Sequence, residues 1–186
     1  QIMWNVLRRG SNVLFYQTEE SKDEMKEGLL RYGWDIDVYE KNGKLKVVDI
    51  FSRGVEIAGE RVMEPERLME ESFNFLDILK EGRNYLGVIR GGELAVFFNS
   101  MSTIFLTMET KKASTFLQYS KMATRVGRCV GIGTLHLGVH DEKIENICKS
   151  SADGIIEMRA TEKDGKLIRR MRVVKMSRTV FHRDIC

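Results

Sequence analysis

The chain has 186 residues, of which 42% are hydrophobic and 31% are charged, and its formal net charge is +3. This composition is typical of a folded globular domain and excludes a disordered chain, and no apolar run approaches the ~20 residues of a membrane-spanning helix. The net charge is too small to indicate a nucleic-acid-binding protein by itself.

Length, cysteine and proline usage indicate one domain in the cytoplasm. The length suffices for a single α/β domain, and one proline argues against a proline-rich linker. The three cysteines form neither a metal-ligand pattern nor a paired disulfide framework, which fits a reducing compartment. We therefore predict a single cytoplasmic domain over residues 1–186, without a membrane segment.

Residues 1–9 have the pattern of the last turns of a helix. Ile2, Met3 and Leu7 lie on one helical face, and Gly10 is a typical C-terminal stop. Because the chain starts within this pattern, we expect the domain to be N-terminally incomplete.

A buried strand over residues 13–18 ends in two carboxylates, Glu19 and Glu20. Ser21 and Glu24 follow with the spacing of a capping box, which marks a helix start. In a parallel sheet the carboxyl ends of the strands open onto the ligand crevice. Two acids there can orient or deprotonate a water opposite a terminal phosphate. The alternative is a pair of solvated acids stabilised by the helix dipole.

The next segments alternate between helix, strand and loop. We predict an amphipathic helix over residues 22–32 and a second strand over 45–50, after an Asn42-Gly43 turn. Residues 52–64 combine glycines and charges with weak periodicity, so we predict a loop there.

A helix is predicted from Pro65 to about Lys80, because proline suits the first helical position. Residues 82–93 contain four glycines and are predicted to be a loop, and residues 94–98 form the most apolar strand. The apolar face of the predicted helix is formed by Leu68, Met69, Phe73, Leu76 and Leu79.

The remaining elements complete an α/β pattern. We predict a helix over 112–126 with Ala113, Phe116, Leu117 and Ala123 facing inward, a strand over 129–135, and a short helix capped by Asp141. Residues 154–158 and 167–176 pair as a hairpin around Asp164-Gly165. The predicted fold class is α/β: a mostly parallel sheet flanked by helices, with a C-terminal antiparallel hairpin at its edge.

The strand over 94–98 ends in Asn99 and Ser100, which resembles a second nucleotide-binding strand. That chemistry requires an aspartate to hold Mg²⁺, and an amide is a weaker ligand for a hard cation. The alternative is a buried strand that ends in an asparagine turn. No segment matches the phosphate-binding pattern G-x-x-x-x-G-K-[ST].

The C-terminal hairpin is basic, with Arg169, Arg170, Arg172, Lys175 and Arg178. These cations either discourage edge pairing, reach a neighbouring subunit's phosphates, or form a nucleic-acid surface. The scarcity of aromatic residues argues against stacking on single strands.

His136 and His140 are four residues apart but do not lie on a helical pattern, so we predict no metal site there.

Six short segments together have the order and spacing of motifs in a known protein family. They are Y-Q-T-E-E-S at 16–21, R-Y-G-W-D-I at 31–36, F-F-N-S-M-S at 97–102, V-H-D-E at 139–142, A-D-G-I-I-E at 152–157 and V-K-M-S-R-T at 174–179. Together they resemble the KaiC-like branch of the RecA superfamily of ATPases, over nearly the whole chain.

The resemblance implies a RecA-type core that binds ATP with Mg²⁺ and assembles into rings or other oligomers. Glu19 and Glu20 match the family's catalytic glutamates, and Asn99, followed by Ser100, stands where the family has its magnesium aspartate. Lys175 matches the lysine that reaches the neighbour's nucleotide. Ser177 stands where the family has an arginine, with Arg178 beside it as a candidate substitute, and His182 lies one place after the family's histidine. The phosphate-loop strand, central in this fold, would precede Gln1.

These observations favour an ATP-binding domain with weak or absent hydrolysis, a regulatory or assembly ATPase that self-associates. A non-catalytic paralogue that binds a protein partner is the alternative. A recombinase-type DNA binder is the third hypothesis, against which the small net charge argues, so we expect no nucleic-acid partner.

Overall fold

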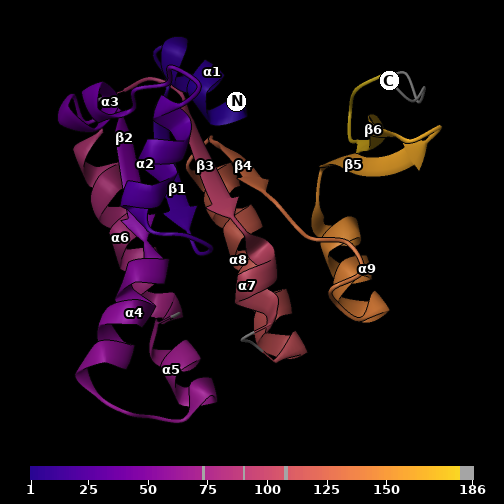
Figure 1. Cartoon of the computed structure of the whole chain (residues 1–186). Coiled ribbons are helices and arrows are strands. Elements are labelled where there is room, and N and C mark those ends of the chain that lie inside the picture. Colours follow the sequence, from indigo (N-terminus) through magenta and orange to yellow (C-terminus); the bar gives the residue numbers. More distant parts are fainter. Residues whose placement is uncertain (73, 90, 107–108, 181–186) are drawn as a thin grey trace. The chain divides into compact units, whose positions relative to one another are not determined.

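A computed structural model describes residues 1–72, 74–89, 91–106 and 109–180 of the chain (Figure 1). Within two of its helices, the side chains at positions 65, 66, 69, 70, 75, 76 and 79 lie outside the described set. The chain divides into two compact units, Gln1–Asp141 and Glu142–Cys186. In the described ranges no helix is both long and apolar enough to cross a membrane.

The first unit contains a four-stranded parallel sheet, as predicted. The strands follow the order β2-β1-β3-β4, and every neighbouring pair runs parallel. Their bounds are β1 Asn12–Gln17, β2 Leu45–Asp49, β3 Leu94–Asn99 and β4 Val130–Gly133. The four carboxyl ends therefore lie at one edge of the sheet.

The described residues of the first unit form eight helices, several of which pack on this sheet. The predicted helices near 1–9, 22–32 and 112–126 are confirmed, with boundaries that shift by one or two residues. The helices are α1 Ile2–Arg8, α2 Lys22–Leu30, α3 Asp37–Lys41, α4 Ile50–Glu60, α5 Pro65–Ser72, α6 Phe75–Val88, α7 Met101–Leu106 and α8 Thr110–Val126. Sequence analysis made no prediction for α7.

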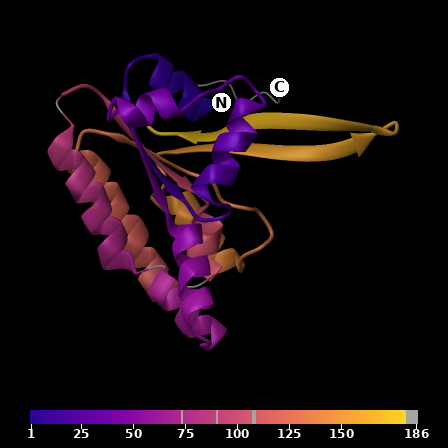
Figure 2. The same ribbon diagram turned by 60° about the vertical axis from the view of Figure 1, so that its left-hand side comes forward.

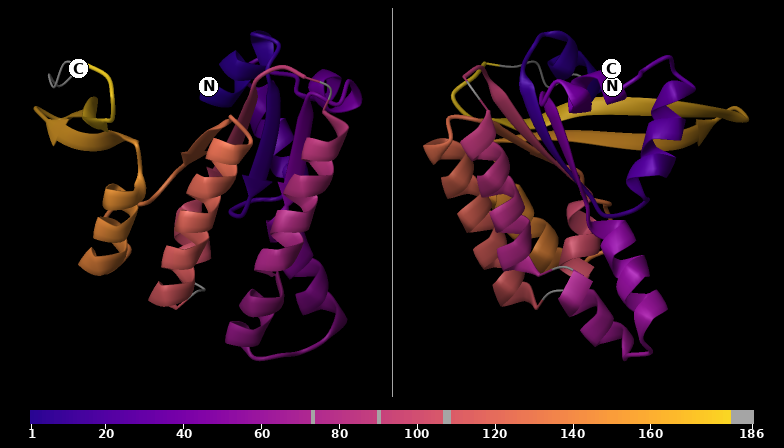
Figure 3. Two further views of the ribbon diagram at one scale, coloured as in Figure 1. Left: turned by 180° about the vertical axis from the view of Figure 1, so that it is seen from behind. Right: turned by 90° about the vertical axis from the view of Figure 1, so that its left-hand side faces the viewer.

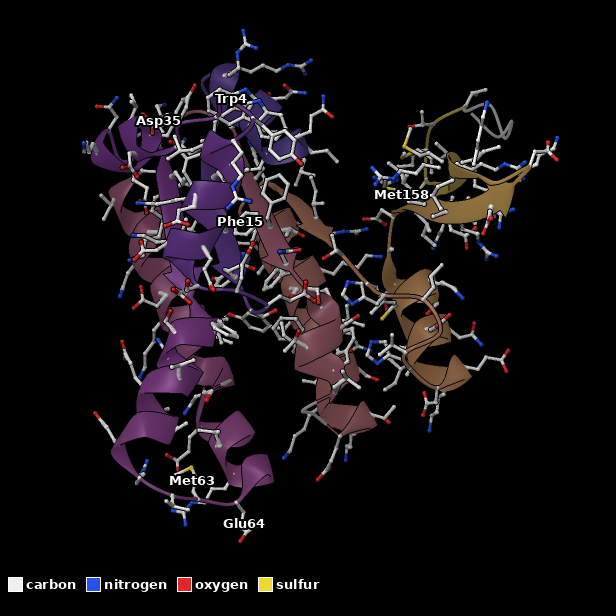
Figure 4. The ribbon with its side chains drawn as sticks, in the orientation of Figure 1. Trp4, Phe15, Asp35, Met63, Glu64 and Met158 are labelled. Carbon is white, nitrogen blue, oxygen red and sulfur yellow. The ribbon has the colours of Figure 1, made fainter. Side chains whose placement is uncertain are left out.

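One face of the sheet packs against the N-terminal helices. Phe15 of β1, labelled in Figure 4, stacks on Phe97 of β3 with ring centroids 5.8 Å apart. Met3 and Leu7 of α1 and Met25 of α2 are buried in the same cluster. Side chains alternate across a strand, so the odd-numbered residues of β1 form this core face.

The opposite face packs against α6 and α8, which Figures 2 and 3 show on the same side of the sheet. The Tyr16 ring stacks on Phe98 at 4.6 Å, and Phe98 meets Phe116 of α8 edge-on at 5.5 Å. Phe116 and Ala113 are buried as predicted, whereas Ala123, predicted to face inward, is exposed. The sheet is thus covered on both faces, as parallel sheets usually are.

The predicted capping box at the start of α2 is confirmed. The Glu24 backbone N–H donates to Ser21 Oγ at 3.2 Å, and the Ser21 backbone N–H donates to Glu24 Oε2 at 2.8 Å. Hydrogen bonds from Ser21 hold the pKa of Glu24 below its usual range. This cap fixes the chain direction immediately after the two acids.

The prediction of a loop over 52–64 is wrong for residues 52–60, which belong to α4, and it holds for residues 61–64. Asp49 caps this helix: its Oδ1 accepts from the Ser52 backbone N–H at 2.8 Å. A Cβ on Gly54 would lie 3.1 Å from Ser72 Oγ, so the glycine permits α5 to approach α4 closely. The glycine that suggested a loop therefore marks a helix contact.

Asp49 joins two helix starts, so its removal should destabilise the first unit. Its Oδ2 also accepts from the Lys22 backbone N–H at 2.7 Å, at the first residue of α2. We expect Asp49→Ala to lower the free energy of unfolding by about 1–2 kcal/mol. Asp49→Asn, which keeps one acceptor oxygen, should lose less. Urea unfolding at unchanged m value measures both, and equal losses would contradict the double cap.

The predicted helix over 65–80 is interrupted and the predicted loop over 82–93 is largely wrong. Pro65 does begin a helix, but α5 ends at Ser72, and α6 then continues to Val88 through Gly82 and Gly87. The side chains of Met69, Phe73, Leu76 and Leu79, part of the predicted apolar face, lie outside the described residues.

The second unit contains one helix and a long antiparallel hairpin, visible as the extended ribbon in Figure 2. The elements are α9 Glu142–Ser151, β5 Gly154–Lys163 and β6 Lys166–Met176. The turn at Asp164 and Gly165 is confirmed, with φ of 53° and 67°. In the described part of the chain the hairpin is a sheet of its own and not an edge of the parallel sheet.

Candidate active site

Side chains that follow three neighbouring strands meet at the carboxyl edge of the parallel sheet. Glu19 and Glu20 follow β1, Asn99 ends β3 with Ser100 after it, and Thr134 follows β4. The structure therefore brings together four of the six residues predicted for the site. Their hydrogen bonds connect strands that are about 80 residues apart in the sequence.

Glu19 is held by the end of β3. The Ser100 hydroxyl donates to Glu19 Oε1 at 2.5 Å, and His136 Nδ1 lies 3.7 Å from the same oxygen. The His136 backbone N–H donates to Ser102 Oγ at 2.8 Å, which fixes the segment after β4 against the first turn of α7. One third of the Glu19 side-chain surface remains accessible, so the carboxylate can meet a water or a substrate.

Glu20 is held by a buried glutamine of β1. Gln17 Nε2 donates to Glu20 Oε1 at 3.1 Å, and Gln17 Oε1 accepts from Asn99 Nδ2 at 3.1 Å. The Thr134 hydroxyl in turn donates to Asn99 Oδ1 at 3.2 Å. The two acids thus have separate supports: Glu19 contacts Ser100, and Glu20 contacts Gln17.

Hydrogen bonds join the ends of β1 and β3 next to the two acids. The Ser100 backbone N–H donates to Thr18 Oγ1 at 2.7 Å, and the Thr18 backbone N–H donates to the Asn99 carbonyl at 2.8 Å. Thr18 and Ser100 are both buried. Satisfied buried hydrogen bonds of this kind make the edge rigid, which suits a site that must hold two carboxylates in place.

The residues at this edge do not fit a protein-held Mg²⁺. Both polar atoms of the Asn99 side chain are engaged, one with Gln17 and the other with Thr134. In the described ranges no three His, Cys, Asp or Glu side chains are grouped to hold a metal. The Asn99 side chain, which the resemblance places at the magnesium position, is thus hydrogen-bonded to Gln17 and Thr134.

Lys175 and Arg178 belong to the second unit. Lys175 Nζ donates to the backbone carbonyls of Lys149 and Ser150, at 3.1 and 3.2 Å, at the end of α9. A cation at this end of a helix is favourable because the last carbonyls lack partners. Arg178 is exposed in a left-handed conformation with φ of 62°. His182 lies outside the described residues.

Sequence reasoning missed Gln17, Thr134 and His136 as site residues. Gln17 is a fully buried polar residue that directly follows the hydrophobic run Val13–Tyr16 of β1, and this change from apolar to polar was a usable signal. His136 was considered only together with His140, whose ring instead meets Phe105 edge-on at 6.2 Å. Thr134 and His136 follow β4 as Asn99 ends β3, so strand alignment would have indicated them.

Comparison with known proteins gives a consistent result. A family model described as "ATPase: KaiC" matches residues 1–185. A UPF0273 protein of Pyrobaculum aerophilum is 28% identical over 180 residues, 96% of this chain and 62% of that protein. A UPF0273 protein of Aeropyrum pernix is 28% identical over 185 residues, 96% of this chain and 70% of that protein.

Two solved structures from Pyrococcus horikoshii share the fold. A KaiC-like protein superposes with a TM-score of 0.71 at 21% identity, over 97% of this chain and 72% of that one. An uncharacterized protein, solved in complex with an unknown peptide, superposes with a TM-score of 0.66 at 20% identity, over 94% and 76%. At such identities the likeness shows the fold alone.

Proposed function

Because this chain belongs to the KaiC family of ATPases, we propose that it is the core of an ATP-binding protein that hydrolyses ATP weakly and acts as a regulatory or assembly ATPase. The observation behind this proposal is the pair Glu19 and Glu20, supported separately at the carboxyl edge of the sheet. A parallel α/β sheet binds its ligands at this edge.

The proposed chemistry needs one of these carboxylates as a general base. A water oxygen attacks the terminal phosphorus, its proton passes to a glutamate carboxylate, and the bond from phosphorus to the bridging oxygen breaks. The products are ADP and phosphate. Hydrolysis is proposed to be weak because both polar atoms of the Asn99 side chain are engaged, with Gln17 and Thr134, so the end of β3 offers no free side-chain oxygen to Mg²⁺.

The phosphate-binding loop is proposed to lie before Gln1 in the full-length protein. The chain spans 62% and 70% of the lengths of the two relatives above, so those proteins contain further residues. Among the described residues β4 pairs on one side only, with β3, and its Val130 is 62% exposed. Strands of parallel sheets are usually covered and paired, so we propose that the further residues complete this sheet with the loop's strand, which is central in the fold of the family.

Self-association and a cytoplasmic location are part of the same proposal. Lys175 would contact the nucleotide of a neighbouring subunit after leaving the carbonyls at the end of α9, with Arg178 close by in sequence. The free thiols of Cys129 and Cys148 fit a reducing compartment. Light scattering of the full-length protein with and without ATP measures the assembly.

The test is nucleotide binding and steady-state turnover by the full-length protein with ATP and Mg²⁺. We expect saturable ATP binding with turnover well below the ordinary enzyme median of about 10 s⁻¹. Turnover at or above that median would contradict weak hydrolysis. A folded protein that binds no ATP at millimolar concentration would contradict the proposal as a whole.

A non-catalytic subunit that binds a protein partner is the second candidate. The engaged amide of Asn99 favours it, and one structural relative was solved with a bound peptide. Failure of the folded full-length protein to bind ATP would support this candidate.

A further inference from the structure

We propose that Thr134, Asn99 and Gln17 form a one-way hydrogen-bond relay that positions Glu20. In this relay Asn99 is a positioning residue whose amide is required as such, and not a weakened magnesium ligand. The inference rests on the proposed function in one respect, namely that Glu20 is a carboxylate of the active site.

Every hydrogen bond of the relay points toward Glu20. The Thr134 hydroxyl donates to Asn99 Oδ1 at 3.2 Å, and Asn99 Nδ2 donates to Gln17 Oε1 at 3.1 Å. Gln17 Nε2 then donates to Glu20 Oε1 at 3.1 Å. An ionised carboxylate only accepts, so it is a suitable end of such a chain.

The orientation of Gln17 is fixed by a fourth contact. Its Oε1 also accepts from the Thr18 backbone N–H at 3.2 Å, as the longer arm of a bifurcated bond whose shorter arm goes to the Asn99 carbonyl at 2.8 Å, and its side chain is fully buried. Rotating the amide by 180° would place its oxygen against the Glu20 carboxylate and its NH₂ against the Thr18 N–H. Buried groups with such mismatched partners are costly, so the glutamine has one satisfied orientation.

This orientation of Gln17 determines which type of side chain is compatible with position 99. The side chain there must donate to Gln17 and accept from Thr134 at the same time, and an amide does both. An aspartate would place an acceptor oxygen against Gln17 Oε1. If the Gln17 amide rotated by 180° to relieve that contact, its NH₂ group would no longer donate to Glu20, and Glu20 would lose this support.

Thr134 is the exposed end of the relay. Its Oγ1 lies 3.2 Å from Asn99 Oδ1 and 3.4 Å from the Phe98 carbonyl oxygen. Because the hydroxyl has a single proton, these are alternative hydrogen bonds, and the one to Asn99 is the shorter. The threonine sits directly after β4. A change at β4 can therefore reach Glu20 through three side chains.

The direct test is NMR of the Gln17 and Asn99 side-chain NH₂ groups in the full-length protein, which needs no turnover. In Thr134→Val, we expect the resonances of both amides to shift and their hydrogen exchange to become about 2–10-fold faster. Thr134→Ser, which restores the hydroxyl, should restore both signals. Thr115→Val, which removes an exposed hydroxyl of α8 that contacts Lys111, is the control outside the site. If the Gln17 NH₂ resonances change no more in Thr134→Val than in Thr115→Val, the relay is overturned.

Turnover provides a second readout. We expect Asn99→Asp to lower kcat by about tenfold without a matching change in KM, because Glu20 loses its support while nucleotide contacts remain. A rise in kcat would mean that position 99 is a magnesium position and would overturn the proposal. If the wild-type protein has no turnover, the proposed function fails, while the NMR result still decides the relay.

Discussion

Of the two variants Glu19→Gln and Glu20→Gln, the one that removes the general base should lower steady-state ATP turnover by about 10²–10⁴-fold, the usual contribution of such a base. The substitution keeps the size of the side chain and removes its ability to take a proton from water. Nucleotide affinity should change little, because the carboxylates act on the water rather than on the bound ligand.

The two variants are expected to separate the roles of the acids. Gln at position 19 can still accept from Ser100, and Gln at position 20 can still accept from Gln17, so neither should disturb the fold. The variant with the larger loss of kcat identifies the base. Glu27→Gln, at an exposed position of α2, is the matched control. Turnover that survives both site variants unchanged would remove the active-site assignment.

The strands and the two acids could be predicted because their signals are local. An apolar run that ends in Glu19, Glu20 and a capping box determines a strand, a turn and a helix start within about ten residues. The parallel order of the strands then places their polar ends at one edge. The placement of Glu19, Glu20, Asn99 and Ser100 at one edge could therefore be predicted without the structure, while their functional role stays a prediction.

The relay could not be predicted in the same way. Gln17 and Asn99 are 82 residues apart, and nothing near either one indicates which atom donates. The polarity of the chain depends on the Thr18 N–H and on Thr134, which come from different strand ends. The strand pattern therefore showed only that Asn99 lacks the charge of an aspartate. It did not indicate that the Asn99 NH₂ group donates a hydrogen bond, which an aspartate could not do.

The two errors in helix assignment have a common physical cause, which is that glycine was interpreted as a loop signal. Gly54 and Gly82 lie inside helices, where each leaves room for a neighbouring side chain. Gly54 faces Ser72 of α5, and Gly82 faces Tyr16 of β1. In a turn, a glycine allows backbone conformations that other residues rarely adopt, and in a helix contact it allows a neighbouring element to approach closely. Composition alone does not distinguish these two uses.

Gly82→Ala is therefore expected to destabilise the first unit by about 1–3 kcal/mol. The new Cβ would lie 2.5 Å from the Tyr16 hydroxyl oxygen, closer than any real contact. That oxygen cannot move easily, because it donates to the Ile78 carbonyl at 3.1 Å and its ring stacks on Phe98. Burial also raises the pKa of Tyr16, so the hydroxyl stays protonated and keeps its role as donor at any ordinary pH.

Gly87→Ala is the matched control in the same helix, and it should have the opposite sign. Nothing lies within 4 Å of a Cβ at Gly87, so the alanine should stabilise the protein by about 0.4–1 kcal/mol through the unfolded state. Urea unfolding of the two variants compares them directly. Equal effects would mean that helix propensity, and not the contact with Tyr16, decides the outcome at Gly82.

The double variant Gly82→Ala/Tyr16→Phe isolates the cause. Without the hydroxyl, the nearest atom to the new Cβ is Leu14 Cδ2 at 3.4 Å, an ordinary contact. The double variant should then be more stable than the sum of the single losses by about 0.5–3 kcal/mol, the range of coupling between residues in contact. Simple additivity would contradict the close approach of α6 to β1, and with it the explanation of why a helix of this sheet contains a glycine there.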